Sequence, residues 1–190
     1  MNVIDRIARW ASTGAFLAAL TLAPPAHAQT AKGGEAEEPA ATLRGPEGGA
    51  TALRQLAGRT DADTTADLSR FLAEAEDPLL RAQAAALLGI IGGDDVVPML
   101  SHAVYDPSAP VRLHAVRALG KVQGTSATPL LCDVLRQDAD SRVRRTALRW
   151  LAALPGDEAR LAVEQAATDA DASVRREAKR ALATWAKPTP

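Results

Sequence analysis

The chain has 190 residues, of which 47% are apolar but only 3% aromatic, and its formal net charge is −1. This length suits one ordinary domain or a short repeat array, and the apolar fraction is sufficient for a hydrophobic core. A net charge so close to zero gives no overall attraction to nucleic acid or to anionic membranes. The single cysteine, Cys132, excludes an internal disulfide, so we expect stability to come from packing of helices rich in Ala and Leu.

The first 28 residues have the three-part layout of a secretory signal peptide. Arg6 and Arg9 form a basic start, residues 15–23 (AFLAALTLA) form an apolar stretch, and residues 26–28 (AHA) form a small-x-small cleavage site. The apolar stretch is shorter than the ~20 residues that a membrane-spanning helix needs. We therefore expect cleavage after Ala28 and a periplasmic or secreted protein without a membrane span. A retained anchor is the alternative.

Residues 29–49 are rich in Gly, Pro, Glu and Ala and contain almost no large apolar side chain. Such a segment cannot bury enough surface to offset the entropy lost on ordering. The composition predicts a disordered linker at 29–49, followed by a folded domain at 50–187 and a short tail at 188–190.

Four segments of the remaining chain repeat one short phrase. They are PLLRAQAAALLG at 78–89, APVRLHAVRALG at 109–120, SRVRRTALRWLA at 141–152 and ASVRREAKRALA at 172–183. Their arginines, Arg81, Arg112, Arg144 and Arg175, are 31, 32 and 31 residues apart. A period of this length, filled with helix-forming residues, is typical of stacked helical repeats.

Apolar residues within each repeat are spaced as on one face of a helix. First helices share an i, i+4, i+7, i+8 stripe, as in Val111, Ala115, Ala118 and Leu119. Second helices carry a shorter stripe, as in Leu131, Val134 and Leu135. A single helix pair cannot bury both stripes, so the pairs are expected to stack. We count one divergent pair near residues 53–72, three regular pairs and a terminal half-repeat ending at Trp185.

An aspartate precedes the arginine by six residues in three copies: Asp106 and Arg112, Asp138 and Arg144, Asp169 and Arg175. This pattern inside an Ala/Leu helix resembles HEAT repeats, particularly the short type related to phycocyanobilin-lyase repeats. The resemblance implies an all-α, right-handed solenoid of stacked antiparallel helix pairs, with these Asp and Arg residues in a ladder between repeats. The first copy departs from the pattern, because Ala75 stands six residues before Arg81.

The resemblance also indicates where a partner would bind, since the second-helix face of HEAT arrays is usually concave. Aligned positions there are varied in size and mixed in charge, which suits a protein or peptide partner. We therefore predict a protein–protein interaction scaffold, with its partner-binding residues at His102, Tyr105, Asp133, Arg136, Gln165 and Thr168. The alternative is an enzyme or enzyme-accessory protein resembling bilin-lyase-type HEAT proteins and acting on a bound cofactor.

The sequence offers little catalytic chemistry, and we predict a non-enzyme without a cofactor. Deoxyhypusine hydroxylase, an enzyme class with HEAT-like repeats, resembles this array but uses repeated His-Glu pairs for two irons, and no His-Glu dipeptide occurs here. Outside the signal segment, His102 and His114 are expected on opposite layers, so a shared metal site is not predicted. No glycine-rich phosphate loop, nucleophile elbow or Cys-x-x-Cys motif is present.

Two clusters of basic residues lie at 142–149 and 175–180. One interpretation is a basic stripe that binds phosphate or an acidic partner. We favour the other, in which these residues belong to the ladder or lie on solvent-exposed helix faces. Cys132 aligns with Ser101 and Glu164, so we expect its side chain to be partly exposed. The thiol is then either redox-active or unreactive. Trp150 is assigned to the core. Trp185 either caps the core or marks a docking edge.

Overall fold

The computed structural model describes residues 46–186, where all regular elements are helices. The predicted signal peptide, the linker up to residue 45 and the tail at 188–190 lie outside the described residues. The α-helices, in chain order, are α3 (Pro46–Leu56), α4 (Ala62–Glu74), α5 (Pro78–Ile91), α6 (Val97–Ala103), α7 (Ala109–Gln123), α8 (Thr128–Gln137), α9 (Ser141–Ala153), α10 (Asp157–Ala166) and α11 (Ala172–Trp185). Short 3-10 turns at Asp94–Val96 and Gly124–Ala127 precede α6 and α8.

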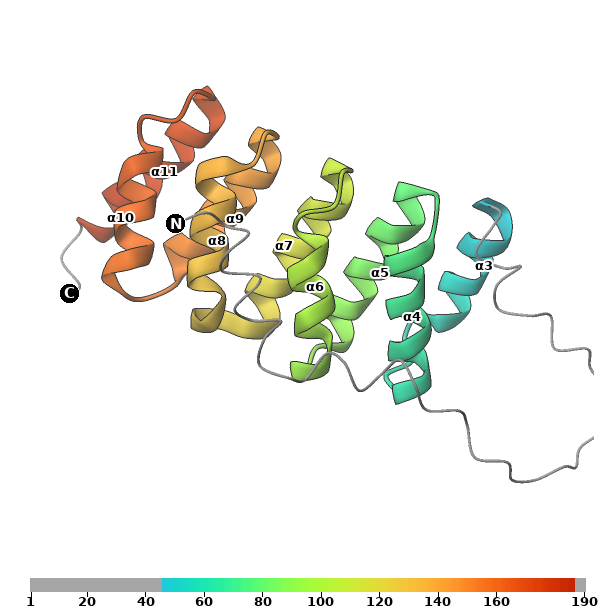
Figure 1. The fold of residues 1–190 in the computed structure, drawn as a ribbon. Helices are drawn as coiled ribbons and strands as arrows, with labels where there is room; N and C mark the ends of the chain where they lie inside the picture. Colours follow the sequence, from blue (N-terminus) through green and yellow to red (C-terminus); the bar gives the residue numbers. More distant parts are fainter. Residues whose placement is uncertain (1–45, 187–190) are drawn as a thin grey trace, which may run out of the picture. The chain divides into compact units, whose positions relative to one another are not determined.

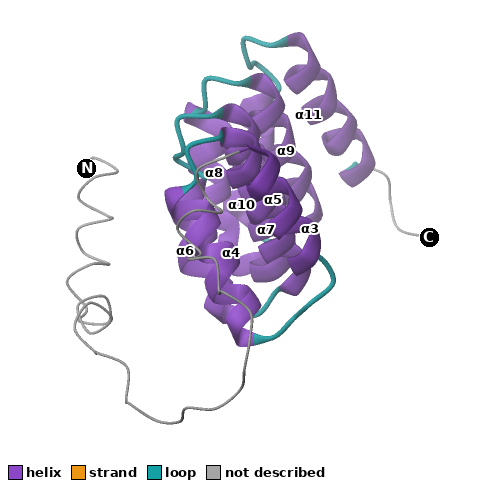
Figure 2. Ribbon diagram, turned by 90° about the vertical axis from the view of Figure 1, so that its right-hand side faces the viewer, coloured by secondary structure: helices purple, strands orange, loops and turns teal. Residues whose placement is uncertain are grey.

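The helices of residues 46–186 alternate between two layers (Figure 1). The first helices of the repeats, α3, α5, α7, α9 and α11, form one layer, and the second helices, α4, α6, α8 and α10, form the other. In the view turned by 90°, α4, α6 and α8 lie to the left of α3, α9 and α11 (Figure 2). This is the predicted all-α solenoid, with one divergent pair, three regular pairs and a terminal helix.

The folded part begins earlier than the composition predicts. Helix α3 starts at Pro46, so residues 46–49, which we assigned to the linker, are helical. Gly49 is buried, and a Cβ atom at this position would collide with Leu80 of α5. The missing side chain of Gly49 thus allows α3 to approach α5 closely. The amino-acid composition shows that a residue is glycine, but it does not show the helix–helix contact that the absent side chain permits.

Aspartate side chains cap several helices at their N-termini. Asp61, Asp77, Asp140 and Asp171 each accept a hydrogen bond from a backbone N–H of the first helical turn, at 2.8–2.9 Å. These bonds satisfy donors that have no partner inside the helix. At the other ends of α5 and α7, Gly92 (φ 72°) and Gly124 (φ 52°) adopt left-handed backbone conformations that terminate the helices.

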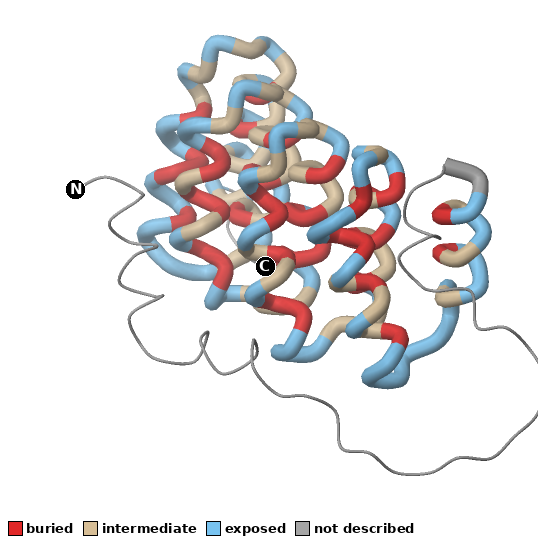
Figure 3. The backbone as a smooth tube through the Cα atoms, turned by 45° about the vertical axis from the view of Figure 1, so that its right-hand side comes forward, coloured by how far each residue is buried: buried red, intermediate tan, exposed pale blue. Residues whose placement is uncertain are grey.

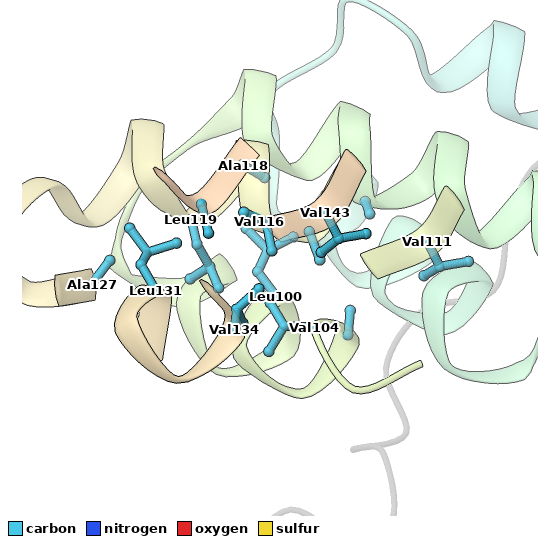
Figure 4. Packing of buried hydrophobic residues seen from close by; sticks show 14 of the residues in the cluster. Leu100, Val104, Val111, Val116, Ala118, Leu119, Ala127, Leu131, Val134 and Val143 are labelled. Atoms are coloured by element: carbon cyan, nitrogen blue, oxygen red, sulfur yellow. The ribbon is translucent and has the colours of Figure 1, made fainter. Parts of the chain in front are cut away.

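The hydrophobic core runs continuously between the layers (Figure 3). The predicted stripes supply it: Val111, Ala115 and Leu119 of α7 are each 0% exposed. Figure 4 shows Leu100 and Val104 of α6 close to side chains of the neighbouring repeats. Each repeat therefore buries apolar surface only together with the next one, as expected of a solenoid.

No helix within residues 46–186 is long and apolar enough to cross a bilayer.

Candidate interaction surface and the ladder that positions it

An arginine–aspartate ladder joins consecutive repeats. Arg81 pairs with Asp106, Arg112 with Asp138, and Arg144 with Asp169. In every pair Nε and one terminal nitrogen of the guanidinium donate to the two carboxylate oxygens, at 2.7–3.0 Å. Such two-pronged bonds to an ionised partner are stronger and more directional than neutral ones. Because the arginine starts one first helix and the aspartate precedes the next, each rung fixes the spacing of two repeats.

An arginine and the aspartate six residues before it contact each other through the main-chain carbonyl of the aspartate, not through its carboxylate. The other terminal nitrogen of Arg112 donates to the main-chain carbonyl of Asp106 at 3.0 Å, whereas the Asp106 carboxylate receives Arg81. Arg144 binds the Asp138 carbonyl in the same way, at 2.8 Å. Every ladder arginine therefore clamps the turn before its own helix while it binds the carboxylate of the following repeat.

The first copy joins this ladder although it lacks the aspartate. Arg81 donates to the carbonyl oxygen of Ala75 at 2.8 Å and to both carboxylate oxygens of Asp106. Arg81 contacts only the main-chain carbonyl of the residue six positions before it, so alanine can take the place of aspartate there. A carboxylate at that position would serve only to bind an arginine of the preceding repeat.

Acid is expected to weaken the array below about pH 4. The Arg144 guanidinium holds the pKa of Asp169 below its ordinary value, and the Arg142 guanidinium lowers the pKa of Asp140 to about 2. Unfolded carboxyls regain pKa values near 4, so this stabilisation is complete above about pH 4 and is lost as the pH falls through the folded pKa values. Urea unfolding at a series of pH values measures the loss, which should be smaller in Asp169→Asn. An unfolding midpoint that stays constant down to about pH 2.5 would contradict this expectation.

The six predicted partner-binding residues lie on or just after α6, α8 and α10, in the layer facing the viewer in Figure 1. All are exposed except Asp133, which is half-buried. Asp133 and Arg136, one turn apart on α8, form an ion pair at 2.9 Å. The structure therefore places the set on one layer, with a different side-chain chemistry on each helix: His102 and Tyr105, Asp133 and Arg136, Gln165 and Thr168.

Two of these residues are held next to the ladder. After α6 the N–H of Tyr105 donates to the His102 carbonyl, at 3.1 Å, and Asp106 follows immediately. After α10 the N–H of Thr168 donates to the Gln165 carbonyl at the same distance, immediately before the ladder residue Asp169. Since the aspartates are fixed by their rungs, the ladder also fixes the ends of the second helices.

Sequence reasoning missed one apolar member of this surface. Leu161 is 55% exposed and stands one turn before Gln165 on α10. In the repeat alignment it takes the place of Pro98 and Pro129, which are also exposed. Its helical spacing from Gln165 was a usable signal, because residues four apart share one face of a helix. We define the second-helix surface as Pro98, His102, Tyr105, Pro129, Asp133, Arg136, Leu161, Gln165 and Thr168.

The expected partial exposure of Cys132 is wrong. Its side chain is 1% exposed, and Sγ faces the carbonyl oxygen of Glu158 at 3.9 Å. Burial, with a smaller contribution from the Glu158 charge, raises the pKa of the thiol to about 11. The aligned Ser101 and Glu164 are more exposed. Local packing therefore overrides the register here, and α10 covers the cysteine.

Cys132 is accordingly expected to be unreactive in the folded protein. At neutral pH a thiol with this pKa holds almost no thiolate, which is the reactive form. Dithionitrobenzoate should label it slowly in buffer and rapidly in denaturant, with one equivalent in total. Rapid labelling of the native chain would show that the thiol is accessible.

The remaining candidate residues are dispersed. His102 is exposed on α6, and His114 is half-buried on α7, in the other layer. Within residues 46–186 no group of three or more His, Cys, Asp or Glu side chains could hold a metal ion. This donor arrangement does not fit a di-iron centre. Trp150 and Trp185 are half-buried against the core, and the Trp150 ring covers Gly120 of the previous repeat.

The two basic clusters lie on α9 and α11, in the first-helix layer. Arg144 belongs to the ladder, while Arg142 and Arg149 form ion pairs with Asp140 and Glu177, at 2.7 and 2.9 Å. Arg176, Lys179 and Arg180 are exposed on α11. The clusters are therefore partly neutralised on α9 and less so on α11.

A two-layer array of helix pairs joined by an arginine–aspartate ladder defines an α-helical repeat protein. The family model for HEAT repeats matches residues 45–120 and 98–183, which together span most of the chain. The chain belongs to the HEAT-repeat family.

Among solved structures, the chain is similar to human deoxyhypusine hydroxylase in complex with glycerol, with 25% sequence identity and a TM-score of 0.56. The match covers 68% of this chain and 44% of the hydroxylase chain, so it spans less than half of that protein's length. A search of curated proteins gave no match.

Proposed function

We propose that this protein is an exported HEAT-repeat scaffold that holds a protein or peptide partner on its second-helix surface and is not itself an enzyme. The observation that carries the proposal is a contrast between positions. Core and ladder residues are alike from repeat to repeat. In contrast, the six residues predicted to bind a partner differ between α6, α8 and α10, and all of them except Asp133 are exposed. Repeat arrays present such variable surfaces to partners.

The chemistry of the surface supports a polypeptide partner. His102, Asp133 and Arg136 provide donors and acceptors of both charges, and Tyr105 and Leu161 provide exposed apolar area. Aromatic residues and arginine are enriched among residues that dominate binding energy at protein interfaces. Export is proposed from the signal-like residues 1–28 alone and places the partner in the periplasm or outside the cell.

The scaffold proposal is tested by partner capture with full-length variants. His102→Ala, Tyr105→Ala and Arg136→Ala should together reduce the amount of captured partner by about tenfold or more. The matched controls, Gln83→Ala and Arg117→Ala, remove exposed side chains from the first-helix layer and should have little effect. Equal losses in both sets would count against a role for the second-helix surface.

The likeness to deoxyhypusine hydroxylase raises a second candidate, an enzyme built on the same repeats. Metal analysis and an absorption spectrum of the protein purified from its native envelope distinguish the two. A scaffold should be colourless and free of stoichiometric metal. A bound chromophore or metal at one equivalent or more would instead support the enzyme.

A further inference from the structure

The outer edge of α11 repeats the edge that every other first helix turns toward the next repeat. On α9 this edge consists of Arg144, Leu148 and Leu151, and both leucines are 0% exposed. The equivalent residues of α11 are Arg175, Lys179 and Leu182. We call these three residues the α11 edge. Along residues 46–186 no further helix follows to cover it.

Arg175 is oriented like the three arginines of the ladder. Its terminal nitrogen donates to the carbonyl oxygens of Asp169 and Ala170, at 2.6 and 2.8 Å, which matches the clamp made by Arg144. In the other rungs Nε and the second terminal nitrogen then bind an aspartate. For Arg175, no residue in 46–186 supplies that carboxylate. The guanidinium is thus already aligned for a two-pronged bond to a carboxylate.

The second residue of the edge indicates which kind of partner fits. Lys179 takes the place of Ala85, Val116 and Leu148, which are all 0% exposed between repeats. A lysine at this position disfavours an apolar repeat stacked in the usual way, because a charge would be buried without a partner. An acidic segment, in contrast, would pair with it. Glu177, the one acidic residue of α11, is already paired with Arg149.

The third residue adds apolar contact. Leu182 is half-buried, and Trp185 one turn later is also half-buried against the core. On the other first helices the leucine equivalent to Leu182 is completely buried by the following repeat. The edge therefore combines two cations with partly exposed apolar side chains, which is the complement of an acidic amphipathic helix.

We propose that the α11 edge is a second docking site, separate from the second-helix surface, for an acidic helical segment of a partner protein. A carboxylate of that segment binds Nε and the free terminal nitrogen of Arg175 and so forms a fourth rung of the ladder. A second carboxylate pairs with Lys179. The carboxylate is preferred to a lipid phosphate because the three existing rungs have this geometry.

The chain itself supplies a defined probe. Residues 156–171 form α10 and its following turn, contain five carboxylates and one arginine, and carry Asp169 to Arg144 in the fold. A rhodamine-labelled peptide of this sequence is titrated with the full chain, and fluorescence anisotropy is recorded. The matched probe is the same peptide with Asp169→Asn. A peptide this short is only partly helical when free, so the affinity is expected to be modest.

Arg175→Gln should weaken binding of the peptide by about tenfold, and Asp169→Asn in the peptide should cause a similar loss. The two losses should not add, because they remove the same contact. Arg176→Gln, an exposed change on the same helix, should change the affinity by less than about threefold. Circular dichroism checks that the variants fold. Arg175→Lys keeps the charge but lacks the planar guanidinium, so it should also lose the two-pronged contact and bind the peptide more weakly.

Peptide binding that is equal for wild type and Arg175→Gln would overturn the proposal, as would no binding at millimolar concentration. A third outcome is that the chain sediments with phosphatidylglycerol vesicles, that Arg175→Gln abolishes this sedimentation, and that the peptide does not bind. This outcome would overturn the proposal in favour of a lipid surface. His102→Ala and Arg136→Ala should leave peptide affinity unchanged, so failure of the second-helix surface and failure of the α11 edge can be told apart.

Discussion

Arg112→Ala is expected to lower the free energy of unfolding by about 3 kcal/mol, because breaking a largely buried ion pair leaves its partner charged and unpaired. The side chains of Arg112 and Asp138 are 14% and 5% exposed, so water can replace little of the lost interaction. The substitution also releases the carbonyl oxygens of Asp106 and Pro107. Urea unfolding monitored by circular dichroism measures the change.

Arg160→Ala is the matched control. Arg160 forms an ion pair with Glu164 on the surface of α10, where the two side chains are 65% and 45% exposed. Pairs of this kind contribute about 0.5 kcal/mol or less. Arg112→Lys should fall between the two alanine variants, since it keeps the charge and loses the two-pronged geometry. Equal effects of Arg112→Ala and Arg160→Ala would show that the ladder does not stabilise the array.

The second large effect is expected from Gly89→Ala, on the face of α5 that packs against α7. Alanine normally favours a helix over glycine by about 1 kcal/mol. Here, however, the added Cβ would lie 2.5 Å from the Ala118 Cβ and 2.9 Å from its Cα. Backbone must move to relieve that contact, at a cost of about 1–3 kcal/mol beyond the helix gain. We expect a lower thermal unfolding temperature and a lower urea midpoint.

A double-mutant cycle separates packing from helix propensity. Gly89→Ala combined with Ala118→Gly removes one of the two colliding atoms, so the pair should be less destabilised than the sum of the single variants. Additive effects, or a stabilised Gly89→Ala protein, would mean that α5 and α7 are not in close contact at Gly89.

The fold was predictable because its main determinant is periodic. The stripes that the sequence shows, such as Val143, Ala147 and Leu151, are the residues buried between layers. The start of the array was placed too late, since Gly48 and Gly49 look like linker residues, whereas Gly49 permits close helix packing. Composition cannot distinguish a glycine that frees the chain from one that lets two helices touch.

The ladder could be predicted only in part. The repeated spacing identified its aspartates and arginines, but which carboxylate meets which guanidinium depends on the stacking distance between repeats. For that reason the pairs are 25 or 26 residues apart, and Arg81 takes part without an aspartate before it. Cys132 was misjudged for a related reason: α10 covers a position that its equivalents leave more open.

Helix alternation alone was enough to assign the six predicted residues to the second-helix layer, where the structure has them. Leu161 was overlooked because an apolar residue on a helix is assigned to the core by default, and its 55% exposure is visible only in three dimensions. On α11 the sequence left only the role of Trp185 open and assigned Arg175 to the ladder. The α11 edge was not predicted, because the orientation of Arg175 depends on main-chain carbonyls that no side-chain pattern records.

Site-specific photo-cross-linking in the native cell envelope is the most direct test of partner binding through the second-helix surface. Benzoylphenylalanine is introduced singly at His102 and Gln165 on the second-helix surface and, as controls, at Gln83 and Arg117 on the first-helix layer; all four side chains are exposed. We expect one discrete cross-linked partner from His102 and Gln165, with little product from the controls. Cross-linking of the same partner only from Gln83 or Arg117 would contradict binding through the second-helix surface.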